Sequence, residues 1–124
     1  MQLAGDYLNE NAGAQSQGKC ATFIRRALEV VEFDMSVRPE LAKDYGPKLE
    51  AIGFSSVDQE NYLPKRGDVI VLQPPTGQMA GHIEMYNGER WVSDFFQRKD
   101  DVYPGPAYRQ QKVEYDIYRY EKKK

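Results

Sequence analysis

The sequence has 124 residues, enough for one domain, and its 17 Lys and Arg against 19 Asp and Glu leave a net charge of −2. A chain so close to neutrality lacks the basic stripe of a dedicated nucleic-acid binder, and no apolar run approaches the ~20 residues of a membrane-spanning helix. The single cysteine excludes an intramolecular disulfide and a cysteine-rich zinc site. We therefore expect one domain over residues 1–124, with no cofactor, no metal, no nucleic-acid partner and no membrane partner.

The first strong pattern is an apolar stripe that starts at Cys20. A small, polar stretch at 13–19 predicts a loop, and apolar side chains then fall at offsets 0, 3, 4, 7, 8 and 11 from the cysteine. This spacing is that of one face of a helix. The members of the stripe are Cys20, Phe23, Ile24, Ala27, Leu28 and Val31. The sequence thus places the thiol in the first turn of an amphipathic helix.

A second helical region is predicted over 39–52. We expect a break near Gly46-Pro47, because a residue that precedes proline is disfavoured in the α region. Gly53 is expected to end this helix, since glycine readily adopts the left-handed conformation found just after a helix.

From Gly67 onward the pattern changes to short strands. Strands are predicted at 68–72, at 82–86, at 90–94 and around the alternating Val113, Tyr115 and Ile117. Asn87-Gly88 stands between the second and the third of these, and an Asn-Gly pair is a strong hairpin signal. Helices followed by antiparallel strands indicate an α+β fold, with a sheet of about four to six strands.

Cys20 and His82 are the residues that could carry nucleophilic chemistry. Unpaired N–H groups and the positive end of the dipole at a helix N-terminus lower the pKa of a thiol and favour the thiolate. The same N–H groups could stabilise the oxyanion that forms when a thiolate attacks an amide. His82 is the single histidine, so any cysteine–histidine mechanism must use it.

A third group usually orients the imidazole through its other ring nitrogen. If the hairpin has a two-residue turn, His82 falls opposite Ser93, and if it has a three-residue loop, His82 falls opposite Asp94. We favour Asp94, because an imidazolium gains more from a carboxylate than from a hydroxyl. Glu84, on the same strand face as His82, is a weaker alternative.

Four segments resemble the NlpC-type and CHAP cysteine amidases, which are papain-like peptidoglycan hydrolases. They are Gly18-Lys-Cys20-Ala-Thr-Phe-Ile-Arg-Arg-Ala27, Gly67-Asp68-Val69, Gly81-His82-Ile83 and Trp91-Val-Ser-Asp94. The resemblance covers about residues 15–95 and implies that Cys20 is the nucleophile and His82 the base. The third position varies among His, Asn, Asp, Glu and Gln in such enzymes, and Asp94 is its match here. The segment 102–124 fits no motif of the family.

The compact form is also similar to the amidase effectors of type VI secretion. This resemblance implies cleavage of a peptidoglycan peptide bond through a thioester, and a cognate immunity protein as a partner. The first ten residues lack the basic leader and apolar stretch of a signal peptide. We therefore expect synthesis in the bacterial cytoplasm and action in the periplasm or wall of a target cell, as a secreted effector or a lysis enzyme.

Three alternatives remain open. The same triad would serve a protein deamidase or acyltransferase, because it determines acyl chemistry and not the acceptor. The domain could instead bind a wall component or a partner protein without catalysis. It could also be part of a longer protein.

Overall fold

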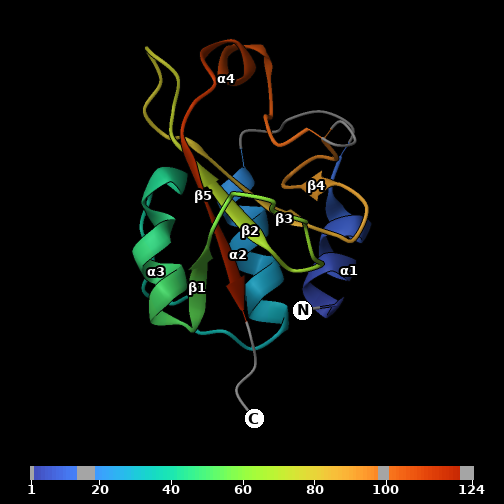
Figure 1. The fold of residues 1–124 in the computed structure, drawn as a ribbon. Helices are drawn as coiled ribbons and strands as arrows, with labels where there is room; N and C mark the ends of the chain where they lie inside the picture. Colours follow the sequence, from blue (N-terminus) through green and yellow to red (C-terminus); the bar gives the residue numbers. More distant parts are fainter. Residues whose placement is uncertain (1, 14–18, 98–100, 121–124) are drawn as a thin grey trace.

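A computed structural model describes residues 2–13, 19–97 and 101–120 (Figure 1). The helical elements are α1 (Gln2–Asn11), α2 (Cys20–Val30), the short 3-10 helix η1 (Ala42–Asp44), α3 (Tyr45–Ala51) and α4 (Pro106–Gln111). The strands are β1 (Phe54–Val57), β2 (Val69–Leu72), β3 (His82–Tyr86), β4 (Trp91–Val92) and β5 (Tyr115–Tyr120). Within the described residues the strands form one antiparallel sheet in the order β1-β5-β2-β3-β4. The predicted α+β fold is confirmed. Most of the predicted loop at 13–19 lies outside the described residues.

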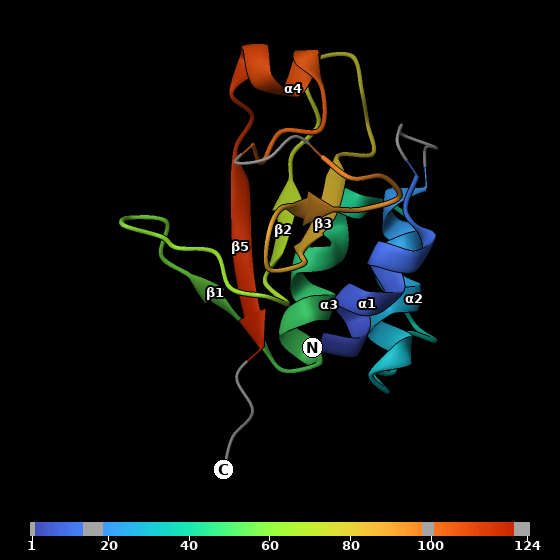
Figure 2. The ribbon, with the colours of Figure 1, turned by 90° about the vertical axis from the view of Figure 1, so that its right-hand side faces the viewer.

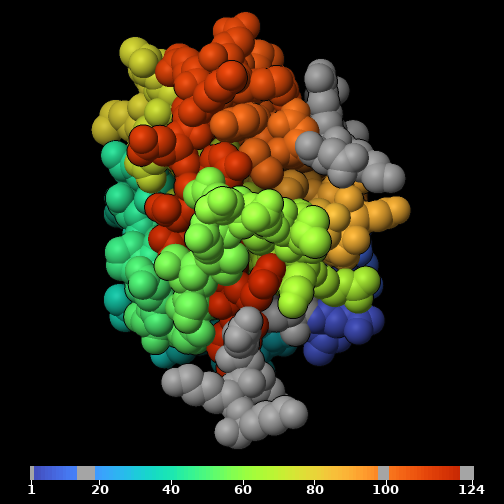
Figure 3. All heavy atoms as spheres, in the orientation of Figure 1, coloured from blue at the N-terminus to red at the C-terminus, as the bar shows by residue number. Residues whose placement is uncertain are grey.

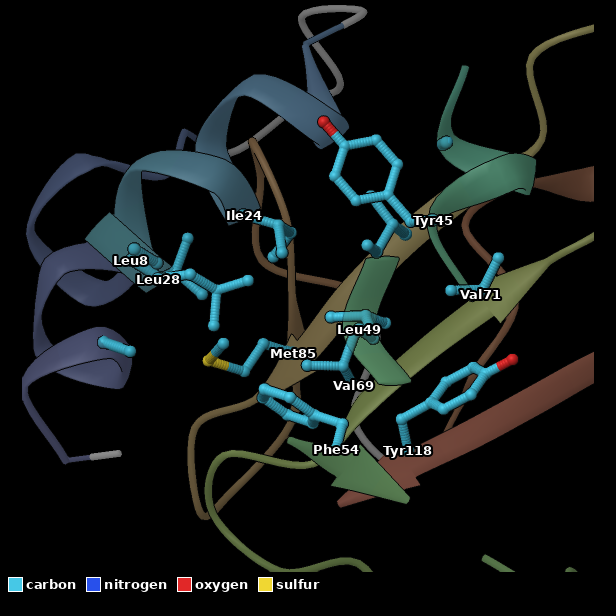
Figure 4. Close-up of a cluster of buried hydrophobic side chains, with 14 of the residues drawn as sticks. Leu8, Ile24, Leu28, Tyr45, Leu49, Phe54, Val69, Val71, Met85 and Tyr118 are labelled. Carbon is cyan, nitrogen blue, oxygen red and sulfur yellow. The ribbon is translucent and has the colours of Figure 1, made fainter. Parts of the chain in front are cut away.

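Helices α1, α2 and α3 lie together on one face of the sheet (Figures 1 and 2). The apolar stripe predicted on α2 faces this layer, since Ile24, Ala27 and Leu28 are fully buried. Figure 4 shows Ile24 and Leu28 directed toward Leu49 of α3 and Met85 of β3. Burying a side chain of this size stabilises the fold by about 1.5–3 kcal/mol. This packing fixes α2 against β3, and so fixes the start of α2 relative to the start of β3.

The other face of the sheet carries a second apolar cluster, built on Ile70, Leu72, Trp91, Val113 and Ile117. The segment 58–66 crosses this face in front of β5 (Figure 3). The buried Asp68 carboxylate ties the segment down, because it accepts hydrogen bonds from the Tyr62 hydroxyl and from the backbone N–H of Lys65. It also accepts from Nε and Nη2 of Arg119, at 2.9 and 2.8 Å, in the parallel arrangement typical of strong arginine–carboxylate pairs.

The predicted break at Gly46-Pro47 is wrong. Both residues lie in the first turn of α3, where a proline is tolerated because its missing N–H would have had no helical partner. The interruption falls earlier, between η1 and α3. Gly53, with a φ of 110°, follows the end of α3 as predicted.

The predicted hairpin register is also wrong. Tyr86 pairs with Trp91, so the connection has the four residues 87–90 instead of two or three. The side-chain Oδ1 of Asn87 accepts the backbone N–H groups of Glu89 and Arg90, at 2.8 and 2.9 Å, and these bonds stabilise the longer turn.

Three elements of the structure had no counterpart in the sequence analysis, namely α1, β1 and α4. The last strand runs over Tyr115–Tyr120, so it begins later than the alternation at Val113 indicated. None of the helices in the described part of the chain is long and apolar enough to cross a bilayer.

Candidate active site

Cys20 and His82 are brought together where the start of α2 meets the start of β3. Cys20 is the first residue of α2, and its sulfur interacts with the His82 ring and with the backbone N–H of Ile83. Burial by itself raises the pKa of the thiol, but the hydrogen bond and positive charge of His82, helped by the Ile83 N–H, outweigh it. The pKa of Cys20 therefore lies below its usual range, as a nucleophilic thiol requires.

His82 is 6% exposed, and its ring is held by Gln97. The Oε1 atom of Gln97 lies 2.8 Å from Nε2 of His82, and the amide nitrogen of Gln97 donates to the carbonyl of Val102 at 3.3 Å. The second bond orients the amide with its oxygen toward the imidazole. An amide oxygen can only accept, so Nε2 carries the proton. This leaves Nδ1 as the nitrogen available to the thiol.

Aromatic side chains flank the imidazole. The ring of His82 lies 6.5 Å from that of Phe95 and 6.2 Å from that of Tyr108, measured between centroids. These contacts flank the ring and restrict its rotation about the Gln97 contact.

Glu84 is a buried carboxylate next to the Nε2 side of the His82 ring. It is fully buried on β3, and its Oε1 lies 3.3 Å from Nε2 of His82. Neither of its carboxylate oxygens has a hydrogen-bond partner among the described residues. Burial therefore raises the pKa of Glu84 to about 7, although His82 and Gln97 oppose the shift.

The charge of the imidazole follows from these neighbours. Burial lowers the pKa of His82, but the interactions with Cys20 and Glu84 outweigh it and raise the pKa to about 10. The lowered pKa of the thiol and the raised pKa of the imidazole both favour the thiolate–imidazolium form of the pair.

The geometric reason for placing Asp94 opposite His82 does not hold. That position depended on a three-residue loop, whereas the connection has four residues and the pairing of β4 with β3 ends at Val92. The Asp94 carboxylate accepts the backbone N–H of Lys19 at 2.9 Å and the hydroxyl of Ser93 at 3.1 Å. Lys19 is the N-cap residue of α2, so Asp94 anchors the residue at which the thiol-bearing helix begins.

Gln97 was not singled out from the sequence. It lies beyond the predicted strand at 90–94, in a segment that turns back after β4 through a bond from the Ser93 N–H to the Phe95 carbonyl. Nothing in the local pattern distinguishes it from a surface glutamine. The one available signal was the resemblance itself, which admits Gln at the third position.

Two cavities lie on the described surface near these elements. One, of about 400 Å³, is lined by Ala21, Thr22 and Arg25 of α2 and by Ser36, Arg38, Pro39, Glu40 and Tyr45. The other, of about 620 Å³, is lined by Tyr115 and Asp116 of β5, by residues 112–114 before this strand, and by Gln59, Gln73 and Tyr103. The lining of neither cavity includes Cys20 or His82. Across residues 2–13, 19–97 and 101–120, no three His, Cys, Asp or Glu side chains form a set that could hold a metal ion.

A thiol-bearing helix packed on an antiparallel sheet, with a histidine on the facing strand, defines a papain-like α+β protein. The comparisons agree with this class. The chain superposes on a chain in the crystal structure of the type VI native effector–immunity complex Tae3–Tai3 from Ralstonia pickettii, with a TM-score of 0.87 and 42% identity over 97% of this chain and 98% of that one. A selenomethionine crystal structure of the same complex gives a TM-score of 0.86 and 42% identity, over 95% and 100%. No protein-family model and no curated protein matches the sequence.

The chain belongs to the same family as a member of this type VI effector–immunity complex. This relationship ties it to type VI secretion, in agreement with the resemblance found in the sequence.

Proposed function

We propose that this chain is the effector of such a pair and that it is a cysteine amidase acting on peptidoglycan peptides. The observation that carries the proposal is the Cys20–His82 pair, in which the pKa of the thiol is lowered and the imidazole is held by Gln97. An immunity protein has no need of an activated thiol beside a buried histidine. Perturbed pKa values that arise from a specific partner are typical of catalytic sites.

The reaction begins with the Cys20 thiolate. Its sulfur attacks the carbonyl carbon of the scissile amide, a carbon–sulfur bond forms, and the carbonyl oxygen gains negative charge. The backbone N–H of Cys20, at the first position of α2, has no partner within the helix and is available to stabilise that oxyanion. Asp94 contributes by holding the start of α2 in place.

His82 moves the protons. Its Nδ1–H passes to the leaving nitrogen as the carbon–nitrogen bond breaks, which leaves a thioester on Cys20 and frees an amine. A water molecule then gives a proton to Nδ1 and attacks the thioester. The carbon–sulfur bond breaks, the carboxylic acid product leaves and the thiolate is restored. Gln97 acts as a positioning residue, because its amide oxygen keeps the Nε2–H bonded throughout the cycle.

The test is the incubation of purified peptidoglycan with the protein, followed by mass analysis of the released fragments. We expect the wild type to release peptide fragments, and Cys20→Ala and His82→Ala to release none while keeping the thermal unfolding midpoint of the wild type within a few degrees. The exposed Arg26→Gln, on the same helix, is the matched control and should keep full activity.

Two results would contradict the proposal. Full activity of Cys20→Ala would remove the thiol mechanism. Absence of fragments, together with inhibition of an added effector by this protein, would assign the chain to the immunity side.

The site of action follows as part of the proposal. The protein made in the cytoplasm of a test bacterium should be tolerated, and the same protein fused to a periplasmic export signal should cause Cys20-dependent lysis. Equal toxicity from the two compartments would favour a cytoplasmic substrate, and with it the deamidase alternative.

A further inference from the structure

Glu84 is a buried carboxylate to which the reaction steps above give no role. Its side chain is fully buried, and its two oxygens have no hydrogen-bond partner among the described residues. In the register of β2 and β3 it stands opposite Ile70, so it points into the apolar cluster on the face of the sheet away from the three helices. A leucine would fill this position without the cost of burying a charge. A buried carboxylate without partners therefore calls for a role other than packing.

The strand places this carboxylate beside the imidazole. His82 and Glu84 are two positions apart on β3, and side chains at that spacing share one face of a strand. Oε1 of Glu84 lies 3.3 Å from Nε2 of His82, whereas Oε1 of Gln97 lies 2.8 Å from the same nitrogen. Gln97 thus has the shorter contact with the Nε2–H, and Glu84 acts on the ring mainly through its charge.

Two other titratable groups lie within electrostatic reach of Glu84. Burial is the main cause of the raised pKa of Glu84, and the charge of Asp101 adds to it, but the Asp101 carboxylate is itself held by Nε and Nη2 of Arg109, at 2.9 and 2.7 Å. Burial raises the pKa of Tyr115, and the charge of Glu84 contributes. In the described part of the chain no Lys or Arg forms an ion pair with Glu84. The imidazolium of His82 is therefore the positive group on which its charge acts.

The importance of this charge changes during the reaction. In the free protein the imidazolium has two anions beside it, the thiolate of Cys20 and the carboxylate of Glu84. Once the thioester has formed, the sulfur is uncharged, and Glu84 is the anion that remains beside the ring. The neutral imidazole must then take a proton from water, which creates the imidazolium again.

We propose that Glu84 is a positioning residue for the second half of the reaction, in which its charge stabilises the imidazolium that forms as water attacks the thioester. The inference rests on the cysteine mechanism proposed above and assigns one of its two steps to a further side chain. In that step the water oxygen bonds to the thioester carbon, the water proton goes to Nδ1 of His82, and the carbon–sulfur bond breaks to restore the thiolate. Glu84 forms no bond and transfers no proton. Formation of the thioester depends on Glu84 less, because the thiolate also stabilises the imidazolium there.

The two steps can be measured separately with p-nitrophenyl acetate at pH 8. Its leaving group needs no proton, so a burst of nitrophenolate reports acylation of Cys20, and the later steady rate reports hydrolysis of the acetyl thioester. We expect Glu84→Gln to keep the burst rate within about threefold of the wild type and to lower the steady rate roughly tenfold or more. Mass analysis of the intact variant should show acetyl groups accumulating on Cys20. Glu84→Asp keeps the charge and should recover part of the steady rate, and the exposed Glu89→Gln is the matched control.

The pH dependence of the hydrolysis step distinguishes an effect of charge from a structural one. In the wild type this step should slow as pH falls, because His82 and Glu84 gain protons. Removing the carboxylate lowers the pKa of His82, so the acidic limb should move to lower pH in Glu84→Gln while its plateau falls. A merely structural role would lower the plateau and leave the limb in place.

The inference would be overturned by an unchanged steady rate in Glu84→Gln, by equal losses in the burst and the steady rate, or by an acidic limb that does not move. Absence of a burst from the wild type would remove the thiol mechanism and this inference with it. The ester contains no part of peptidoglycan, so these results do not depend on the wall substrate. A protein that shows the expected kinetics on the ester and releases no wall fragments would keep the role of Glu84 and contradict the peptidoglycan proposal alone.

Discussion

Nε2 of His82 and Oε1 of Gln97 lie 2.8 Å apart, across 15 positions of sequence. The contact keeps a proton on Nε2 and leaves Nδ1 as the nitrogen that exchanges its proton, because the Gln97 amide is itself oriented by the Val102 carbonyl. Gln97 is a neutral acceptor that holds the ring, whereas the charge that stabilises the imidazolium comes from Cys20 and Glu84. In this site, orientation and charge stabilisation are supplied by different side chains.

Replacing Gln97 by alanine should lower kcat by about 10- to 100-fold with little change in KM, since the residue positions the ring and does not touch the substrate. Gln97→Glu should retain the hydrogen bond, because a carboxylate oxygen also accepts from Nε2–H. It should recover a large part of kcat and move the alkaline limb of the pH–rate profile upward, because a second negative charge raises the pKa of His82 further. Steady-state kinetics on a soluble stem peptide measures both effects. Equal losses in the two variants would mean a purely structural role for Gln97.

Cys20 should react with iodoacetamide at pH 6 faster than a free thiol, whose pKa is roughly 8.5. His82→Ala should slow the reaction, because burial of the sulfur remains while the group that lowers its pKa is lost. At the other end of the range, amide cleavage should fall as pH rises through about 10, where His82 loses the proton that the leaving nitrogen needs. Alkylation should not fall there, because it needs only the thiolate. The pH dependence of the two rates, measured on the same preparation, checks this separation. A thiol that titrates like free cysteine would disprove the ion pair.

Glu84 should make stability depend on pH. Its pKa in the folded protein, about 7, lies above the ordinary value of 4.5, so folding favours the protonated form. The stabilising contribution of that proton is complete below about pH 4.5 and is lost as pH rises through 7. The free energy of unfolding of Glu84→Gln should therefore improve relative to the wild type between pH 5 and pH 8, by up to about 3 kcal/mol at 1.36 kcal/mol per pKa unit.

Urea unfolding at four pH values measures that difference. The exposed Glu89→Gln should show no such trend. A Glu84→Gln curve parallel to that of the wild type would show that the carboxylate is not buried in solution.

Asp94→Ala should destabilise the protein by about 1–3 kcal/mol, because the backbone N–H of Lys19 loses its charged acceptor. Asp94→Asn keeps an acceptor oxygen and should restore most of that loss. It should also leave alkylation of Cys20 at pH 6 as fast or faster, since the Asp94 charge raises the pKa of the thiol. Thermal unfolding and alkylation rates test this, with the exposed Asp6→Asn as control. A loss of turnover in Asp94→Asn as large as that in Gln97→Ala would return Asp94 to the role of orienting His82.

The sequence was most informative where a pattern repeats within one element. The stripe from Cys20 to Leu28 could be predicted without tertiary information, because apolar residues that recur at the helical period lie on one face of the helix, and that face is the one buried in the core. The pairing of Cys20 with His82 could be inferred because the chain offers one thiol and one imidazole. The hairpin failed for a local reason: the Asn87 side chain stabilises a longer turn than the Asn-Gly pair alone indicates. The choice of Asp94 as the group that orients His82 depended on this register, because a change of one residue in register turns every side chain of a strand to the opposite face.

Gln97 could not be found this way, since its role arises from a contact that no periodic pattern encodes. α1 was missed for a similar reason. Its buried residues, Ala4, Gly5 and Leu8, are too few to form a clear apolar stripe, and what stabilises the helix is packing against α2.

The short segment 93–97, which follows β4, contacts both the start of α2, which carries Cys20, and the ring of His82. The Asp94 carboxylate binds the N–H of Lys19 at the start of α2, the Asp94 carbonyl binds the N–H of Gly13 after α1, and Gln97 holds His82. The distance between thiol and imidazole is therefore set by the length of this segment as much as by the residues themselves. One amino acid inserted between Asp94 and Gln97 would leave every reactive side chain in the protein and still uncouple the two anchors. In this region the number of residues matters to the site as much as the residue types do.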